Sequence, residues 1–284
     1  MIIKRVRFGR PWLLTLPLAL AFISFFVAPL LLLFGISGFN DEQITEPGLK
    51  TWGDFLADPF YWRVTGNTIK LGLLTVLATL VIGYPFAVTY TNSGPRTQRV
   101  LLFIIIMPVL LSVVVRTFAW IVILGNEGVI NQTLMALGLT AAPIRLLQTE
   151  FGLILSLTQI ELPMMALPLI SVMSRIDPNL HDASSALGAS RWYTFFRVLV
   201  PLSVPGVIAG CTLVFASSTT AFISQSIIGG NRLVYLPLVV WQQSLVVYNW
   251  PLASVAAVTL LVSVMLCITV FTLIGRRSMR YLNV

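Results

Sequence analysis

Two ionisable side chains lie deep inside apolar stretches of this 284-residue chain, where a charge is costly and often functional. Arg116 lies eight residues before Leu124, where one stretch ends, and Glu161 lies eleven residues after Glu150, where the next stretch starts. At 1.5 Å per residue, both side chains lie roughly 12–16 Å from the same end of two oppositely directed helices. Their similar depth predicts an ion pair. Glu161 suits either a path for a cationic solute or a salt bridge between helices, whereas the structural role is favoured for Arg116.

A polar stripe occupies one end of a later apolar stretch, at residues 217–220 and 224–226. Such side chains line a solute path or form hydrogen bonds between helices. Prolines at 163, 168, 201 and 205 indicate broken helices near a transport site, or packing kinks. The candidate pathway residues are Glu161, Arg116, Ser217, Thr220, Gln225 and Ser226.

The residue sets that catalysis and metal binding require are missing from the sequence. His181 is the only histidine, and Cys211 and Cys267 lie far apart in apolar segments, which excludes a multi-histidine site or a thiolate cluster. No Gly-x-x-x-x-Gly-Lys-[Ser/Thr] loop is present to bind ATP. We therefore predict that the chain is not an enzyme and holds no cofactor or metal of its own.

The composition is that of a membrane protein. Hydrophobic residues make up 57% of the chain and charged residues only 10%, with a mean hydropathy of +0.92. A soluble protein carries about 25% charged residues to cover its surface. The composition therefore argues against a cytosolic enzyme, and the elements that position the polar residues must be membrane spans.

Six apolar stretches are each long enough to cross the bilayer as a helix. They cover residues 12–36, 67–90, 100–124, 151–174, 198–222 and 251–274. The stretches lack the alternation of a membrane barrel, so an all-α protein with one transmembrane domain over residues 1–284 is predicted.

The basic residues indicate the orientation, because cytoplasmic loops of membrane proteins are rich in lysine and arginine. Most of the 18 basic residues fall on one side: Lys4, Arg5, Arg7, Arg10, Arg96, Arg99, Arg175, Arg191, Arg197, Arg276, Arg277 and Arg280. Both termini are therefore expected in the cytoplasm, with loops 37–66 and 223–250 outside. The basic residues of the cytoplasmic loops then account for the net charge of +8, and no nucleic-acid partner is needed to explain it.

Residues 175–197 form the most informative cytoplasmic stretch, which we call the coupling segment. Asp177 and Pro178 are a good helix start, and Gly188 is a flexible point between two short helices. Small residues at 183–189 let a partner approach the backbone, and Trp192 and Phe196 supply apolar anchors. The segment is either a docking element or an ordinary interfacial helix.

The order Asp182-Ala-Ser-Ser-Ala-Leu-Gly188 resembles the EAA loop of permeases from binding-protein-dependent ABC importers, and the likeness extends to Pro201 and Gly206. Asp182 replaces the glutamate of that pattern, and Ser184 replaces its second alanine. Residues 115–120, 125, 128–131, 162–168, 228–230 and 249–251 resemble the spermidine/putrescine-type subfamily.

The resemblance implies a MetI-like permease subunit of the inner membrane. It also implies two cytoplasmic ATPase subunits that hold ATP and magnesium, a second and non-identical permease, and a periplasmic solute-binding protein. The residues that would contact the ATPase are Asp182, Ala183, Gly188, Ala189 and Trp192.

The solute is less well defined than the class of transporter. Polyamine-type members carry an acid shortly before the Gly-Gly pair, and Ser226 takes that place here. A polyamine-like or other amine-containing solute is expected, with an opine, a phosphonate or a thiamine-like compound as alternatives. A stand-alone secondary transporter is less favoured, because the sequence shows no relay of titratable residues and no internal repeat.

Overall fold

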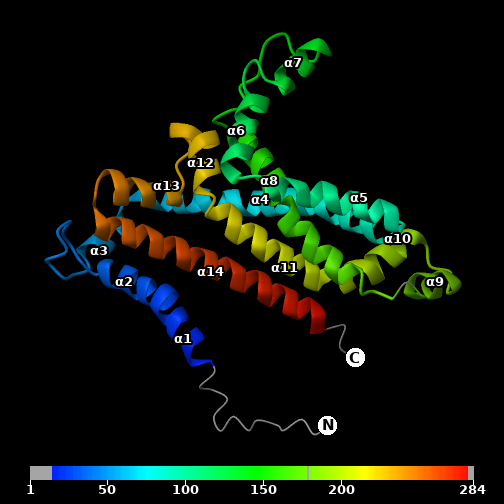
Figure 1. The fold of residues 1–284 in the computed structure, drawn as a ribbon, viewed down its shortest axis with the longest axis horizontal. Helices are drawn as coiled ribbons and strands as arrows, with labels where there is room; N and C mark the ends of the chain where they lie inside the picture. Colours follow the sequence, from blue (N-terminus) through cyan, green and yellow to red (C-terminus); the bar gives the residue numbers. More distant parts are fainter. Residues whose placement is uncertain (1–14, 178, 281–284) are drawn as a thin grey trace, which may run out of the picture. The chain divides into compact units, whose positions relative to one another are not determined.

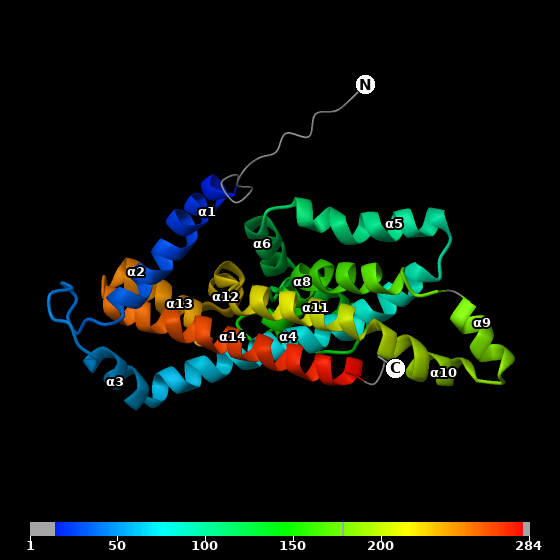
Figure 2. The ribbon, with the colours of Figure 1, turned by 90° about the horizontal axis from the view of Figure 1, so that it is seen from below.

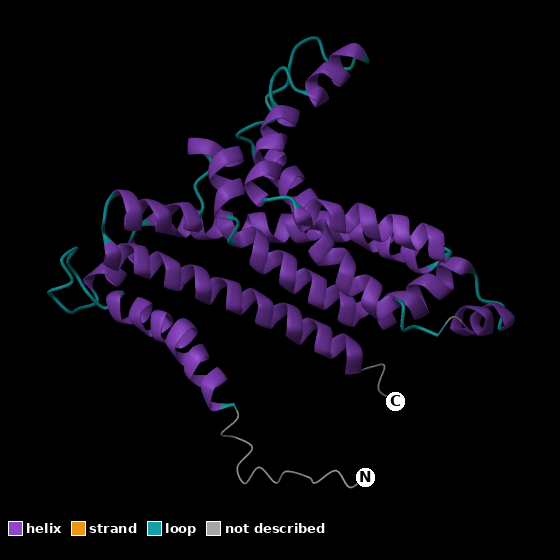
Figure 3. Ribbon diagram, in the orientation of Figure 1, coloured by secondary structure: helices purple, strands orange, loops and turns teal. Residues whose placement is uncertain are grey.

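The computed structural model describes residues 15–177 and 179–280, except for the side chains at 181–183, 185, 231 and 277–280. The regular elements in this part of the chain are helices, and the only β pairing there is an isolated bridge between Phe39 and Pro47 (Figure 3). The chain divides into two compact units. One contains the residues up to Pro59 together with Val240–Val258, and the other contains Phe60–Val239 and the chain from Thr259 onward.

In the first unit, α1 (Leu16–Phe22), the π-helical turn η2 (Ile23–Val27) and α2 (Ala28–Ile36) join end to end into a single apolar helix. A loop then leads to α3 (Lys50–Ala57). In this loop the Asp41 carboxylate accepts hydrogen bonds from the Thr45 hydroxyl at 2.6 Å and from the Glu46 N–H at 2.7 Å. These bonds, with the Thr45 hydroxyl contributing most, lower the pKa of Asp41 below its ordinary value. The loop is therefore folded around an ionised side chain.

Three long helices of the second unit pack side by side in both views: α4 (Pro59–Thr91), α8 (Glu150–Met173) and α11 (Val200–Thr219) (Figures 1 and 2). Glycines on α11 bring its backbone close to α8. A Cβ at Gly206 would lie 3.1 Å from the Pro168 carbonyl oxygen, and one at Gly210 would lie 3.1 Å from the Met165 carbonyl oxygen. Because small residues allow close helix packing in membranes, α8 is largely buried in the core of this unit.

The third predicted span, a continuous helix over 100–124, is wrong. The structure has α5 (Pro95–Ile106), a 3₁₀ turn η3 (Met107–Leu110) and a separate α6 (Val113–Leu124). Pro108 lacks the N–H that an α-helix needs, and Leu111 is extended, with ψ 141°. Ser112 then starts the new helix, because its hydroxyl accepts the N–H of Val114 at 3.3 Å.

Shorter elements complete the chain: α7 (Val129–Ala136), α9 (Asn179–Ala186), α10 (Arg191–Thr194), the π-helical turn η4 (Phe195–Leu199), α12 (Phe222–Gly229), η5 (Gly230–Arg232), α13 (Leu236–Trp241) and the π-helical turn η6 (Gln242–Val246). The last helix, α14 (Trp250–Arg280), contributes residues to both units.

Six apolar helical segments in the described chain are long enough to cross a membrane, and one of them, Val113–Ala136, consists of α6 and α7 with a break at residues 125–128. The six segments are Leu16–Ile36, Pro59–Thr91, Val113–Ala136, Glu150–Met173, Arg191–Thr219 and Trp250–Arg276. The predicted all-α membrane fold with six apolar helices is therefore confirmed. The helix over Leu236–Val246 is apolar but shorter than these spans.

Candidate functional site

The Glu161 carboxylate lies in the middle of α8 and is only 4% exposed. Its Oε1 accepts a hydrogen bond from the Ser217 hydroxyl of α11 at 2.8 Å. No described residue donates a hydrogen bond to its Oε2. A buried carboxylate needs a cation or several donors, and one neutral hydroxyl supplies only part of that. The Arg116 charge also acts on Glu161, and Oε2 is left without a hydrogen-bond donor among the described residues.

Arg116 does not form the predicted ion pair with Glu161. Its Nη1 donates to the main-chain carbonyl of Ile160 at 3.4 Å, one residue before Glu161, and its Nε is buried without a partner among the described residues. The carboxylate instead contacts Ser217, which lies on a different helix. The charges of the two side chains still act on each other, so equal depth did bring them near, but the guanidinium contacts the neighbouring main chain and not the carboxylate.

The chain breaks between α11 and α12, at Thr220 and Ala221, and the Gln225 side chain bridges this break. Its Nε2 donates to the carbonyl oxygens of Ser218 at 2.9 Å and Thr219 at 3.2 Å, and its Oε1 is buried without a partner. The neighbouring Ser224 hydroxyl shares a hydrogen bond with Thr117 of α6 at 3.1 Å. The polar network thus joins α6, α11 and α12.

Thr117, Ser218 and Ser224 belong to this network but were not among the predicted pathway residues. Ser218 and Ser224 fall inside the polar stripe of the sequence, and Thr117 directly follows Arg116. These positions next to predicted residues are the sequence signal that could have identified them. Thr220 and Ser226 behave differently. The Thr220 hydroxyl donates to the Ala216 carbonyl at 2.8 Å, and the Ser226 hydroxyl donates to the Ile223 carbonyl at 3.1 Å, so each bonds within its own helical segment.

The coupling segment forms two short helices, α9 and α10, bent at Gly188, as predicted. Asp177 caps α9, because its Oδ1 accepts the N–H of Asn179 at 2.9 Å. Gly188 has φ +81°, a conformation that costs little only for glycine. The Ser184 and Thr194 hydroxyls share a hydrogen bond at 2.7 Å that joins the two helices.

The coupling segment presents an apolar face that the described chain leaves uncovered. Leu187 is 89% exposed and Trp192 is 74% exposed, and the Trp192 ring stacks on Phe196 with centroids 6.1 Å apart. Ala189 is partly buried beside the bend. The side chains of Asp182 and Ala183 lie outside the described part of the structure.

Residues 79–282 match the family described as the inner membrane component of binding-protein-dependent transport systems. The chain belongs to this family. The permease protein PotB of the spermidine/putrescine transport system of Haemophilus influenzae is 35% identical over 216 residues, which is 76% of each chain. The chain is therefore a permease component of an ABC importer and a multi-pass protein of the inner membrane.

Solved structures share the fold of this chain. A bacterial ABC transporter that imports the acidic polysaccharide alginate matches with a TM-score of 0.78 and 18% identity, over 95% of this chain and 96% of that chain. The MetNI methionine ABC transporter in inward-facing conformations matches with a TM-score of 0.56 and 20% identity, over 80% of this chain and 100% of that chain. At these identities the likeness concerns the fold alone.

Proposed function

We propose that this permease carries a polyamine, or a closely related amine, across the inner membrane. The observation that carries the proposal is the buried Glu161 carboxylate, with one oxygen held by Ser217 and the other without a partner among the described residues. A protonated amine forms a strong, charge-assisted hydrogen bond with such an oxygen. The 35% identity to PotB supports the same class of solute.

Ser226 is the observation that favours a solute other than a polyamine. Its hydroxyl donates to the Ile223 carbonyl of its own helix, at the place where the resemblance to polyamine-type permeases implies an acid. A solute with fewer positive charges, such as an opine, a phosphonate or a thiamine-like compound, is therefore the second candidate. The two candidate solutes differ in the number of positive charges that acidic groups of the site must balance.

The assembly that we propose contains two cytoplasmic ATPase subunits, a second and non-identical permease, and a periplasmic binding protein. ATP and magnesium bind to the ATPase subunits, and this chain contributes no catalytic group, cofactor or metal. The exposed Leu187, Trp192 and Phe196 support a contact between the coupling segment and an ATPase. In this assembly the chain is one permease domain with both termini in the cytoplasm, as the distribution of basic residues favours.

Uptake of labelled putrescine and spermidine by cells with and without the gene tests the proposal. We expect gene-dependent uptake, and we expect Glu161→Gln to lower it at least about tenfold, because a hydrogen bond to a charged group contributes about 1.5–3 kcal/mol. Glu127→Gln is the matched control, since Glu127 is an exposed acid beyond the end of α6.

Immunoblots of membrane fractions establish that each variant is present at the normal level. Equal polyamine uptake with and without the gene, while the protein is in the membrane, would refute the polyamine assignment. Normal uptake by Glu161→Gln would remove Glu161 from the pathway.

A further inference from the structure

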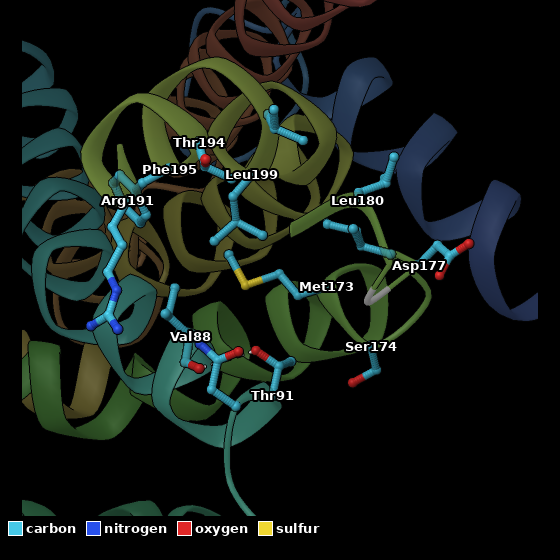
Figure 4. A pocket seen from close by; sticks show the side chains of 13 residues that line it. Val88, Thr91, Met173, Ser174, Asp177, Leu180, Arg191, Thr194, Phe195 and Leu199 are labelled. Atoms are coloured by element: carbon cyan, nitrogen blue, oxygen red, sulfur yellow. Dashed lines mark hydrogen bonds between the residues drawn. The ribbon is translucent and has the colours of Figure 1, made fainter. Parts of the chain in front are cut away.

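A half-open cavity of about 280 Å³ lies at one end of the helical core of the second unit (Figure 4). Its walls come from the end of α4, the end of α8 and the coupling segment. The apolar part of the lining includes Val88, Met173, Phe195 and Leu199. The proposed transport mechanism uses none of this space.

The cavity lies where two of the apolar spans end. The span of α4 ends at Thr91 and the span of α8 ends at Met173, and both residues line the cavity. Where spans end, lipid headgroups lie beside the protein. We therefore place this opening at the depth of the headgroups.

The charged groups on the rim favour an anion. Arg191 and Asp177 lie on opposite sides of the cavity (Figure 4). Asp177 already accepts the N–H of Asn179, whereas Arg191 is exposed and makes no hydrogen bond or ion pair with another described side chain. The nearby sequence adds Arg96, Arg99 and Arg175, so basic groups outnumber acidic ones near this opening.

We propose that this cavity binds one anionic phospholipid, with its phosphate at Arg191 and the first part of an acyl chain against Met173, Phe195 and Leu199. Basic pockets between spans at the cytoplasmic boundary are suited to acidic headgroups, and an arginine fork pairs with phosphate oxygens. Because Arg191 and Phe195 belong to the coupling segment, the bound lipid joins that segment to α4 and α8. This inference rests on the membrane spans and not on the identity of the solute.

Native mass spectrometry of the full-length protein in mild detergent tests the site, with phosphatidylglycerol as the probe. We expect the wild type to retain one phosphatidylglycerol that Arg191→Gln binds about fivefold more weakly, the effect of one basic group near an acidic headgroup. Arg197→Gln is the matched control, because the Arg197 guanidinium lies over the Tyr193 ring and does not line the cavity. Val88→Trp, which fills the apolar floor, is expected to reduce retention as well.

Three results would overturn the assignment. One is equal retention of phosphatidylglycerol by the wild type, Arg191→Gln and Val88→Trp. Another is equal retention of phosphatidylcholine, which would show that the site does not select an acidic lipid. The third is displacement of the lipid by inorganic phosphate alone, which would identify a site for free phosphate. Lipid retention is read without transport, so a failure here is distinct from a failure of the polyamine proposal.

Discussion

At the scale of single residues, the central contact of the proposed pathway joins Ser217 to Glu161. The hydroxyl donates to Oε1 at 2.8 Å and so fixes the direction of the carboxylate. The sequence identified both residues, because a charge in an apolar stretch and a serine run are visible without a structure. It did not reveal that they meet, since the rotation of each helix depends on packing, here on the close approach at Gly206 and Gly210.

Removing the Ser217 hydroxyl is expected to weaken transport without removing the carboxylate. We expect Ser217→Ala to lower uptake by about threefold to tenfold, because a typical hydrogen bond contributes about 0.5–1.5 kcal/mol. Ser217→Thr keeps a hydroxyl and is expected to restore most of the activity. The rate of labelled solute uptake at limiting concentration measures both. Wild-type uptake by Ser217→Ala would show that Glu161 needs no orientation by Ser217.

At the scale of elements, the length of an apolar stretch predicted the bounds of a helix well, except where a local residue interrupts the backbone hydrogen bonds. The stretch 151–174 became α8 (Glu150–Met173) almost unchanged, because an uninterrupted apolar run has no alternative to helix in lipid. The stretch 100–124 was divided at Pro108 and Ser112. Pro108 lacks an N–H donor and Ser112 is an N-cap residue, and both can be recognised in the sequence. A count of apolar residues does not take either property into account.

The bend between α9 and α10 leads to a prediction about Gly188. A Cβ at Gly188 would meet nothing within 4 Å. A substitution there therefore acts locally through backbone strain at φ +81° or by blocking the approach of a partner protein. We expect Gly188→Trp to abolish uptake while the protein still inserts into the membrane, because the ring occupies the surface where an ATPase would approach. Asparagine tolerates positive φ, so Gly188→Asn should retain more activity than Gly188→Ala.

Gly138 offers a control with matched local strain, since it has φ +70° and also has open space around a Cβ. Gly138→Trp should leave uptake and co-purification with the ATPase near their normal levels. Comparable losses from both tryptophan variants would mean that backbone strain, and not docking at the coupling segment, explains the effect.

At the scale of the whole molecule, the charge pattern predicts orientation, and the fold alone does not. Loop 37–58 carries Glu46 in an exposed position, and the coupling segment carries the exposed Leu187. With Cys211 and Cys267 replaced by alanine, we expect an impermeant maleimide to label Glu46→Cys in intact cells with permeable outer membranes. Leu187→Cys should react only after the inner membrane is opened. The reverse pattern would place both termini outside.

The helix from Arg191 to Thr219 has a mechanical consequence. It runs without interruption through α10, η4 and α11, so Arg191 and Ser217 are the two ends of one rod, about 39 Å apart along its axis. If the segment moves as one body, a shift imposed at Arg191 also moves the Ser217 hydroxyl relative to the Glu161 carboxylate. By reciprocity, a solute that changes this hydrogen bond also changes the preferred position of the rod at the opposite end. Binding of a solute at Glu161 and binding of an ATPase at the coupling segment would then both be coupled to the same movement of this helix.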